Sequence, residues 1–150
     1  MSVGAFCNRE VVVATPDTGI AALARLMRHH HVGDVVIVDN SDPAKVMPLG
    51  IVTDRDLVME LLAKAVAPDS VTAGDLLADR LVTAHEQDSL WHTIKRMRAS
   101  GIRRMVVVDD HTNLIGILTL DDIMELLADE LSTLAKIPGQ ELAREAIHRD

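Results

Sequence analysis

The chain alternates short, continuous runs of hydrophobic residues with longer segments in which hydrophobic residues recur every three or four positions. Short continuous runs are typical of strands buried on both faces, whereas the longer spacing is typical of helices with one buried face. The short runs predict strands at residues 11–13, 35–38, 49–53, 81–83, 105–108 and 114–119. The periodic segments predict helices near residues 20–30, 56–66, 72–78, 89–100, 122–134 and 140–148.

Turn-forming residues mark several ends of these elements. Thr15-Pro16-Asp17 predicts the start of the first helix, and Gly33 is expected to end it. Gly101 follows a later helix, at the position where a left-handed terminus favours glycine. Pro138-Gly139 is expected to stop the helix over residues 122–134, because proline cannot continue a helix.

One segment of the chain occurs twice. The sequence Gly50-Ile51-Val52-Thr53-Asp54-Arg55-Asp56-Leu57 returns as Gly116-Ile117-Leu118-Thr119-Leu120-Asp121-Asp122-Ile123. Met27 and Met97 are 70 residues apart and Gly50 and Gly116 are 66 apart, so the second copy has lost four loop residues. Each half has the order strand, helix, strand, strand, helix, which predicts an α/β (α+β) fold. Because one half alone would leave a sheet face bare, the halves should pack about a pseudo-twofold axis.

Composition argues against several classes of protein. Of the 150 residues 48% are hydrophobic, enough to bury a core, but there is one Trp, one Phe and no Tyr. A formal charge of −8 and the lack of aromatic stacking platforms argue against nucleic-acid binding. Cys7 is the only cysteine, so no internal disulfide can form, and no segment approaches the roughly 20 apolar residues of a membrane span. We therefore expect a cytoplasmic protein without a nucleic-acid or membrane partner.

These repeated features resemble a tandem pair of CBS domains, a module named after cystathionine β-synthase and also called a Bateman module. The threonine-proline helix start, the strand at residues 35–39, the Gly-Ile-x-Thr-x-x-Asp segment and the helix after it carry the resemblance. Val36 and Val106 depart from the family, whose strands often carry proline there. The resemblance implies a first CBS repeat with the N-terminal segment at 1–66, a linker with a short helix at 67–80, a second repeat at 81–135 and a helical tail at 136–150.

The resemblance also implies a function. Such pairs are regulatory modules that bind adenosyl ligands such as AMP, ADP, ATP, S-adenosylmethionine or NAD, without a catalytic cofactor. One carboxylate can accept both hydroxyls of a ribose diol, a role that suits Asp56 and Asp122 in the first turn of a helix. The alternative is that Thr-x-x-Asp only caps the helix. Thr72-Ala73-Gly74-Asp75 has the same spacing without the preceding strand, and we expect it to be only a cap.

By resemblance to the family, each of two clefts combines the Thr-x-x-Asp of one half with the pre-helix threonine region and central-strand entry of the other. The first cleft would combine Ile51, Thr53, Arg55, Asp56, His85, Leu90, Ile102, Arg103 and Arg104. The second cleft would combine Thr15, Ile20, Val32, Gly33, Asp34, Ile117, Thr119 and Asp122.

The two sets differ in charge. Arg103 and Arg104 join Arg55 in the first set, whereas Asp34 lies in the second, with Asp121 nearby in sequence. We expect the first cleft to prefer phosphorylated ligands and the second to accept a nucleoside or a less anionic group. The alternative is that Arg103 and Arg104 are a solvated pair at a strand entrance.

The sequence predicts no catalytic or metal site. The tract His29-His30-His31 places consecutive helical side chains about 100° apart, so they do not converge on one ion, and we expect a solvated helix end. Cys7 is expected to be a buried thiol. No Gly-rich phosphate loop, zinc motif or serine elbow is present.

We therefore predict a regulatory sensor, not an enzyme, in which an adenosyl ligand changes the arrangement of the domains or of a dimer. The expected protein partners are an unidentified effector protein and a second copy of the chain, bound through Leu61, Leu62, Leu126 and Leu127. The main alternative is a ligand-free interaction scaffold with empty clefts. A lesser alternative is an enzyme or metal sensor that uses the histidines.

Overall fold

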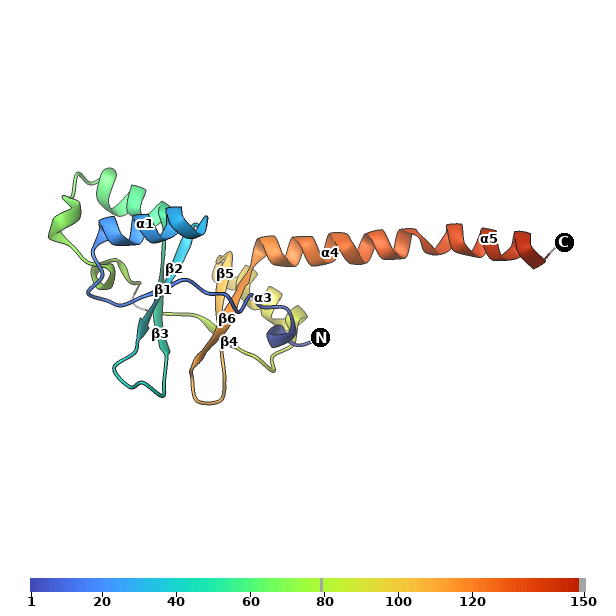
Figure 1. Cartoon of the computed structure of the whole chain (residues 1–150), viewed down its shortest axis with the longest axis horizontal. Coiled ribbons are helices and arrows are strands. Elements are labelled where there is room, and N and C mark those ends of the chain that lie inside the picture. The colour runs from blue at the N-terminus through green and yellow to red at the C-terminus, as the bar shows by residue number, and fades with distance from the viewer. Residues whose placement is uncertain (79, 149–150) are drawn as a thin grey trace. The chain divides into compact units, whose positions relative to one another are not determined.

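The computed structural model describes residues 1–78 and 80–148 and contains two three-stranded sheets (Figure 1). In each sheet the first strand runs parallel to the second. The predicted α+β fold and its duplicated strand order are confirmed. The first sheet has the order β1 (Val13–Ala14), β2 (Asp34–Asp39), β3 (Met47–Thr53), and the second has the order β4 (Thr83–His85), β5 (Arg104–Val108), β6 (Leu114–Thr119).

The chain divides into two compact units, Met1–Leu118 and Thr119–Asp150. The second unit contains helices α4 (Leu120–Ala135) and α5 (Ile137–His148). The helical elements of the first unit are η1 (Val3–Ala5), α1 (Ile20–His30), α2 (Asp54–Asp56), η2 (Leu57–Leu62), η3 (Pro68–Ser70), η4 (Ala73–Leu76) and α3 (Leu90–Ser100).

The two long helices of the first unit end in the same way. Helix α1 ends before His31 at φ 54°, and α3 ends before Gly101 at φ 65°. The prediction for Gly101 is confirmed, but Gly33 does not end α1, because His31 already adopts the left-handed conformation two residues earlier. The side chains of His29, His30 and His31 are exposed, so the predicted solvated helix end is confirmed.

The helix after β3 begins two residues earlier than predicted and changes its winding. Three α-helical residues, Asp54–Asp56, lead into the π-helical segment Leu57–Leu62. Leu61 is 2% exposed and packs in the core, but Leu62 is 74% exposed. Of the two leucines expected to contact a second copy, only Leu62 is therefore exposed. Consecutive helical side chains point in different directions, and the core takes only Leu61 of this pair.

The strands β2 and β5 are buried on both faces, as their continuous apolar runs predicted. Val35 and Ile37 of β2 pack with Leu23 and Met27 of α1 in one cluster. On the opposite face, β2 contributes to a second cluster that also receives residues from the other sheet. Its buried members are Val36, Val38, Val106, Val108 and Ile117. The two repeats thus share a valine-rich core, which explains how a chain with one Phe and no Tyr can fold.

The N-terminal segment packs on the second repeat, and the linker between the repeats packs on the first. The amides of Val3 and Gly4 donate to the carbonyl oxygens of Asp88 and Glu86 at 2.9 and 2.8 Å. Seventy residues later, the amides of Ala73 and Gly74 donate to the carbonyl oxygens of Thr18 and Pro16, both at 2.9 Å. The repeat therefore extends back to η1 and η4, which each complete one half.

Cys7 follows η1 and is buried, which confirms the predicted buried thiol. Its Sγ would lie 2.7 Å from a Cβ atom at Gly116. Burial raises the pKa of the Cys7 thiol, and the nearby Arg9 opposes this in part. The thiol therefore serves as a small apolar side chain in the second repeat.

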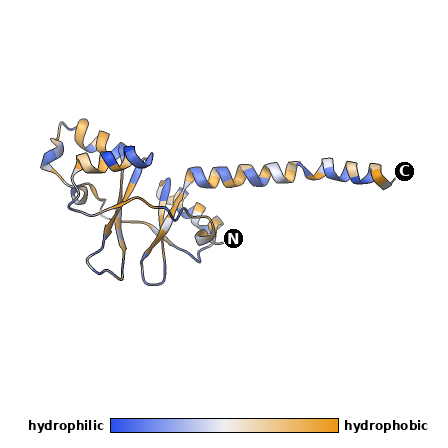
Figure 2. Ribbon diagram, in the orientation of Figure 1, coloured by the Kyte–Doolittle hydropathy of each residue, from blue (hydrophilic) through white to orange (hydrophobic). Residues whose placement is uncertain are grey.

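The second unit is helical almost throughout, but its break differs from the prediction. Lys136 separates α4 from α5, and Pro138 and Gly139 lie in the first turn of α5. Pro138 does not stop a helix there, because the first-turn amide groups have no partner within the helix. Among residues 1–78 and 80–148, no helix is long and apolar enough to cross a membrane. Hydrophobic and hydrophilic residues alternate along both helices (Figure 2).

Candidate functional site

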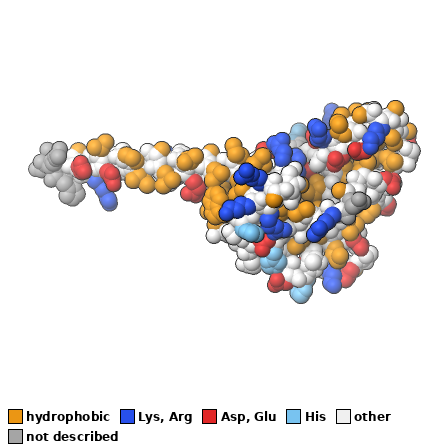
Figure 3. All heavy atoms as spheres, turned by 180° about the vertical axis from the view of Figure 1, so that it is seen from behind, with side chains coloured by type: hydrophobic (Ala, Val, Ile, Leu, Met, Phe, Trp, Pro, Cys, Tyr) orange, Lys and Arg blue, Asp and Glu red, His pale blue; other side chains and the backbone are white. Residues whose placement is uncertain are grey.

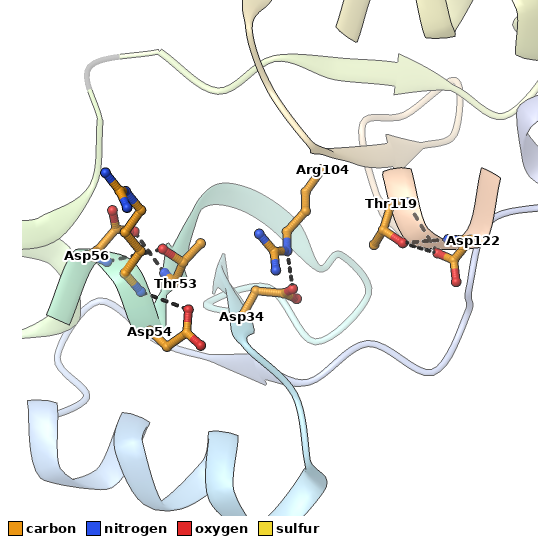
Figure 4. Close-up of polar contacts among 8 residues, drawn as sticks. Asp34, Thr53, Asp54, Asp56, Arg104, Thr119 and Asp122 are labelled. Carbon is orange, nitrogen blue, oxygen red and sulfur yellow. Dashed lines mark hydrogen bonds and ion pairs between the residues drawn. The ribbon is translucent and has the colours of Figure 1, made fainter. Parts of the chain in front are cut away.

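Thr53 and Asp56 bind each other where β3 meets the following helix (Figure 4). The Thr53 amide donates to Asp56 Oδ2 at 2.8 Å, and the Asp56 amide donates to Thr53 Oγ1 at 3.2 Å. This reciprocal capping box holds the carboxylate in one orientation. Within residues 1–78 and 80–148, Asp56 Oδ1 accepts no hydrogen bond, so one carboxylate oxygen stays available to a ligand.

The same reciprocal contact occurs at the other Thr-x-x-Asp segments. Asp122 Oδ2 accepts the Thr119 amide at 3.2 Å and the Thr119 hydroxyl at 2.6 Å. Asp75 Oδ2 accepts the Thr72 amide at 2.8 Å. The capping interpretation is therefore correct for all three segments. Any further role in ligand binding must come from what surrounds each carboxylate.

The surroundings of Asp56 include a cavity of about 510 Å³, a volume suited to a small organic ligand. A smaller cavity of about 140 Å³ shares Ile51, Ile102 and Arg104 with it. The larger cavity is lined by Ile51, Thr53, Asp54, Arg55, Asp56, Gly101, Ile102, Arg103 and Arg104. The smaller cavity adds Gly50, Ala78, Arg80, Leu81 and Val82. Together they place an apolar wall beside a polar region with two aspartates and several arginines.

An ion pair crosses between the repeats at this site (Figure 4). Arg104 Nε donates to Asp34 Oδ2 at 2.5 Å, and the side chains are 31% and 18% exposed. Asp34 begins β2 and Arg104 begins β5. Sequence analysis did not predict this pair, because it assigned the two residues to different clefts.

A second cavity, of about 540 Å³, lies at the corresponding place on the first repeat. It is lined by Asn8, Glu10, Val11, Val12, Val13, Leu26, His30 and Val32. Asn8, Val11, Val12 and Val32 precede Ala78, Leu81, Val82 and Ile102 of the smaller arginine-lined cavity by 70 residues. The two cavities are thus built in part from equivalent positions.

Charge is reversed between these equivalent positions. Where one repeat contributes arginine to the first site, the other carries an acidic residue or glycine. The correspondences are Arg80 with Glu10, Arg103 with Gly33 and Arg104 with Asp34 at an offset of 70, and Arg55 with Asp121 at an offset of 66.

Most members of the first predicted set lie together. Ile51, Thr53, Arg55, Asp56, Ile102, Arg103 and Arg104 all line the larger arginine-containing cavity. His85 and Leu90 do not line it: Leu90 is fully buried, and His85 Nε2 lies 2.8 Å from Asp110 Oδ1. Sequence reasoning missed Asp54, Gly101 and the apolar wall. The 70-residue offset between the repeats relates Leu81 and Val82 to Val11 and Val12, and this relation is the sequence signal that could have pointed to them.

The second predicted set is more dispersed within the first unit. Val32 lines the 540 Å³ cavity, whereas Ile20 and Ile117 are core residues, 6% and 5% exposed. The Thr15 hydroxyl is bound to Asp17 and lines a different cavity with it. Gly33 and Asp34 lie beside Arg104. Thr119 and Asp122 form the capping box of α4.

Two further carboxylates at equivalent positions stabilise turns. Hydrogen bonds from Ser41 lower the pKa of Asp39, and hydrogen bonds chiefly from Asn113 lower the pKa of Asp109. Their role is structural, since each binds amides of the loop that follows its strand. No group of three or more His, Cys, Asp or Glu side chains suited to a metal ion is found in the described part of the chain.

Comparison with known proteins places these features in context. A family model described as CBS domain matches residues 3–63 and 73–129. Protein MK0525 of Methanopyrus kandleri is 37% identical over 126 residues, which are 84% of this chain and 62% of that protein. The chain therefore spans less than two thirds of that relative. Hypoxic response protein 1 of Mycobacterium tuberculosis is 32% identical over 110 residues, 73% of each chain.

Solved structures agree with this match. The CBS domain pair of protein MJ0100, in complex with 5′-methylthioadenosine and S-adenosyl-L-methionine, has a TM-score of 0.72 and 25% identity. The similarity covers 85% of this chain and 99% of that one. Hypoxic Response Protein I, solved with two coordinated zinc ions, has a TM-score of 0.70 and 28% identity over 83% of this chain and 98% of that one.

Proposed function

Because this chain belongs to the CBS domain family, we propose that it is a regulatory module, not an enzyme, that binds an adenosyl ligand beside Thr53 and Asp56. The observation that carries the proposal is the joint placement of an apolar wall, a fixed carboxylate and several arginines around two cavities that share lining residues. The pair of MJ0100, which binds two adenosyl compounds, supports the ligand class.

The residues that line the two cavities offer a partner for each part of a nucleotide. Ile51, Ile102 and Val82 offer apolar surface for a purine base. Asp56 Oδ1 can accept the ribose hydroxyls while Oδ2 keeps its bond to the Thr53 amide. Arginines at one end suit a phosphate, since charged hydrogen bonds of this kind contribute about 1.5–3 kcal/mol each when shielded from water. Arg104 is partly exposed, so its contribution falls below that range.

The charge reversal supports unequal sites. The 540 Å³ cavity has Glu10 where the other site has Arg80, and a carboxylate there would oppose a phosphate. We infer that the arginine-lined site prefers phosphorylated ligands such as AMP, ADP or ATP. The equivalent site on the other repeat prefers a nucleoside or a less anionic adenosyl group.

Regulation would follow from a ligand-dependent arrangement of the repeats, which an effector protein or a second copy of the chain then senses. The size of any response equals the difference in ligand affinity between the two arrangements. Leu61 is buried and cannot serve as the predicted dimer contact. Helix α4 offers a better surface, because Leu120, Met124, Leu131 and Leu134 are 38–66% exposed. Figure 3 shows hydrophobic side chains at the surface along the helices of the second unit.

Calorimetric titration with AMP tests the proposal directly. Asp56→Ala should weaken AMP binding at least tenfold, because it removes the diol acceptor. Asp75→Ala is the matched control, since it breaks the same type of capping box away from the cavities. Both variants should lose similar stability, about 0.5–2 kcal/mol. Equal AMP affinity in the two variants would contradict the proposal.

The alternative of a ligand-free scaffold draws support from the capping boxes, which already engage each Thr-x-x-Asp, and from the ion pair on Arg104. A thermal-shift titration separates the two functions. A ligand at 100 times its dissociation constant should stabilise the fold by about 2.7 kcal/mol. No shift with AMP, ATP, S-adenosylmethionine or NAD, and no adenosyl compound in mass spectra of the purified protein, would favour the scaffold.

A further inference from the structure

The Asp34–Arg104 ion pair joins the first residues of two equivalent strands, one from each repeat. Arg104 Nε donates to Asp34 Oδ2 at 2.5 Å (Figure 4). Asp34 is 18% exposed and Arg104 31% exposed, so water screens the pair only in part. The contact therefore links the central strands of the two repeats electrostatically.

Arg104 also lines both cavities, which places it within reach of a ligand. A guanidinium binds a phosphate best through two parallel N–H groups. One of the guanidinium edges that can form such a pair includes the Nε–H group, and in Arg104 this group already donates to Asp34. A phosphate that takes this edge must displace Asp34, whereas a ligand without a phosphate has no need to do so.

We propose that Asp34 competes with the ligand's phosphate for Arg104, so that a phosphorylated ligand opens the ion pair between the repeats and an unphosphorylated one leaves it closed. This inference rests on the proposed function, because it assigns the regulatory step to the same site. Asp34 thereby sets the affinity for phosphate and couples phosphate binding to the contact between β2 and β5.

A second carboxylate of the site provides a control. Asp54 lines the larger cavity, and its Oδ2 would lie 3.2 Å from a Cβ at Gly33, while Arg104 Nη2 would lie 3.5 Å from it. Asp54 Oδ1 accepts the Arg55 amide at 2.8 Å. Among the described residues, Asp54 makes no ion pair with Arg104. Asp54→Asn therefore removes one carboxylate charge from the neighbourhood of Arg104 without breaking the ion pair.

The test is calorimetric titration of the full chain with AMP and with adenosine. Asp34→Asn should bind AMP about tenfold more tightly than the wild type and bind adenosine unchanged. Asp54→Asn should raise AMP affinity less than Asp34→Asn does, because it removes one carboxylate charge but leaves Arg104 Nε bound to Asp34. An unchanged AMP affinity in Asp34→Asn, or an equal gain in Asp54→Asn, would overturn the competition. A wild type that binds neither compound would instead overturn the proposed function and this inference with it.

Arg104→Gln separates competition from a structural role. It breaks the same ion pair from the other side, but it also removes the cation that the phosphate would bind. Competition predicts opposite effects: tighter AMP binding in Asp34→Asn and weaker binding in Arg104→Gln. A pair that only holds the repeats together would change AMP affinity in the same direction in both variants, and that result would overturn the inference. If Asp34→Asn does not fold, an unchanged AMP affinity in Arg104→Gln would still overturn the inference.

Discussion

The carbonyl oxygen of Asn8 lies 2.6 Å from the position that a Cβ atom would take at Gly116. Asn8 and Ile117 also exchange two backbone hydrogen bonds, each 2.9 Å long, so this carbonyl cannot move away freely. The glycine that opens the repeated strand is therefore required by the N-terminal segment packed against it. At Gly50, the equivalent position, the nearest atom is instead Leu77 Cδ2, also at 2.6 Å.

These contacts predict unequal costs for the same substitution. Gly116→Ala should lower the free energy of unfolding by about 1–3 kcal/mol, because the methyl group meets backbone. Gly50→Ala should cost less, since the end of the Leu77 side chain can rotate away. Urea denaturation of both variants measures the difference. Equal losses in the free energy of unfolding would contradict this prediction, because they would show that the backbone at Asn8 shifts as easily as the Leu77 side chain.

Cys7 should resist thiol reagents in the folded protein. The thiol is buried, burial raises its pKa, and only the thiolate reacts. Its reaction with Ellman's reagent should therefore be slow at pH 8 and become fast in denaturant. Because the folded pKa lies above the unfolded one, this group's contribution to stability is complete below the unfolded pKa and is lost as pH rises through the folded value. Cys7→Ala should therefore lose less stability at alkaline pH than the wild type. A fast reaction of Cys7 with Ellman's reagent in the folded protein would contradict the burial of the thiol.

Helix α4 should mediate self-association. Leu120, Met124, Leu127, Leu131 and Leu134 follow the alternating spacing of four and three residues that suits pairing of helices. Light scattering after size-exclusion chromatography should show a concentration-dependent dimer, which Leu131→Glu disrupts. Ser132→Glu is the control, because it adds the same charge at a neighbouring exposed position outside this series. A monomeric wild type, or equal effects of both variants, would contradict this role of α4.

The charge reversal between the repeats predicts different consequences for the two repeated aspartates. Asp56→Ala should abolish measurable AMP binding at the arginine-lined site, whereas Asp122→Ala should leave most AMP affinity intact. The affinity for adenosine should depend less strongly on which aspartate is removed, because adenosine carries no phosphate. Calorimetry with both ligands on both variants checks this. Equal loss of AMP affinity from each variant would refute the asymmetry.

Much of the fold could be predicted because repetition supplied an internal check. The apolar run at 35–38 and its counterpart at 105–108 required strands buried on both faces, and the structure places them in shared clusters. The structure packs η1 on the second repeat and η4 on the first. Sequence analysis did not predict this, because the hydrogen bonds of Val3 and Ala73 join residues that are distant in sequence. Leu61 was expected at a dimer contact but faces the core, and α1 ends before His31 because this non-glycine residue adopts the left-handed conformation expected of Gly33.

The candidate site was predicted in part for the same reason. The repeated Thr-x-x-Asp located Thr53 and Asp56, and the cavity beside them includes the three arginines expected there. The contact between Asp34 and Arg104 could not be inferred from periodicity, because pairing across a core depends on how the repeats pack. Leu90 was carried over from the family pattern, but its side chain is wholly buried here.

A crystal structure of the protein grown with excess AMP tests the central claim most directly. The account predicts AMP in the cavity beside Ile51 and Ile102, with Asp56 Oδ1 within hydrogen-bonding distance of the ribose hydroxyls and Oδ2 still accepting the Thr53 amide. A cavity that holds only solvent, with Asp56 bound to its own backbone alone, would contradict it.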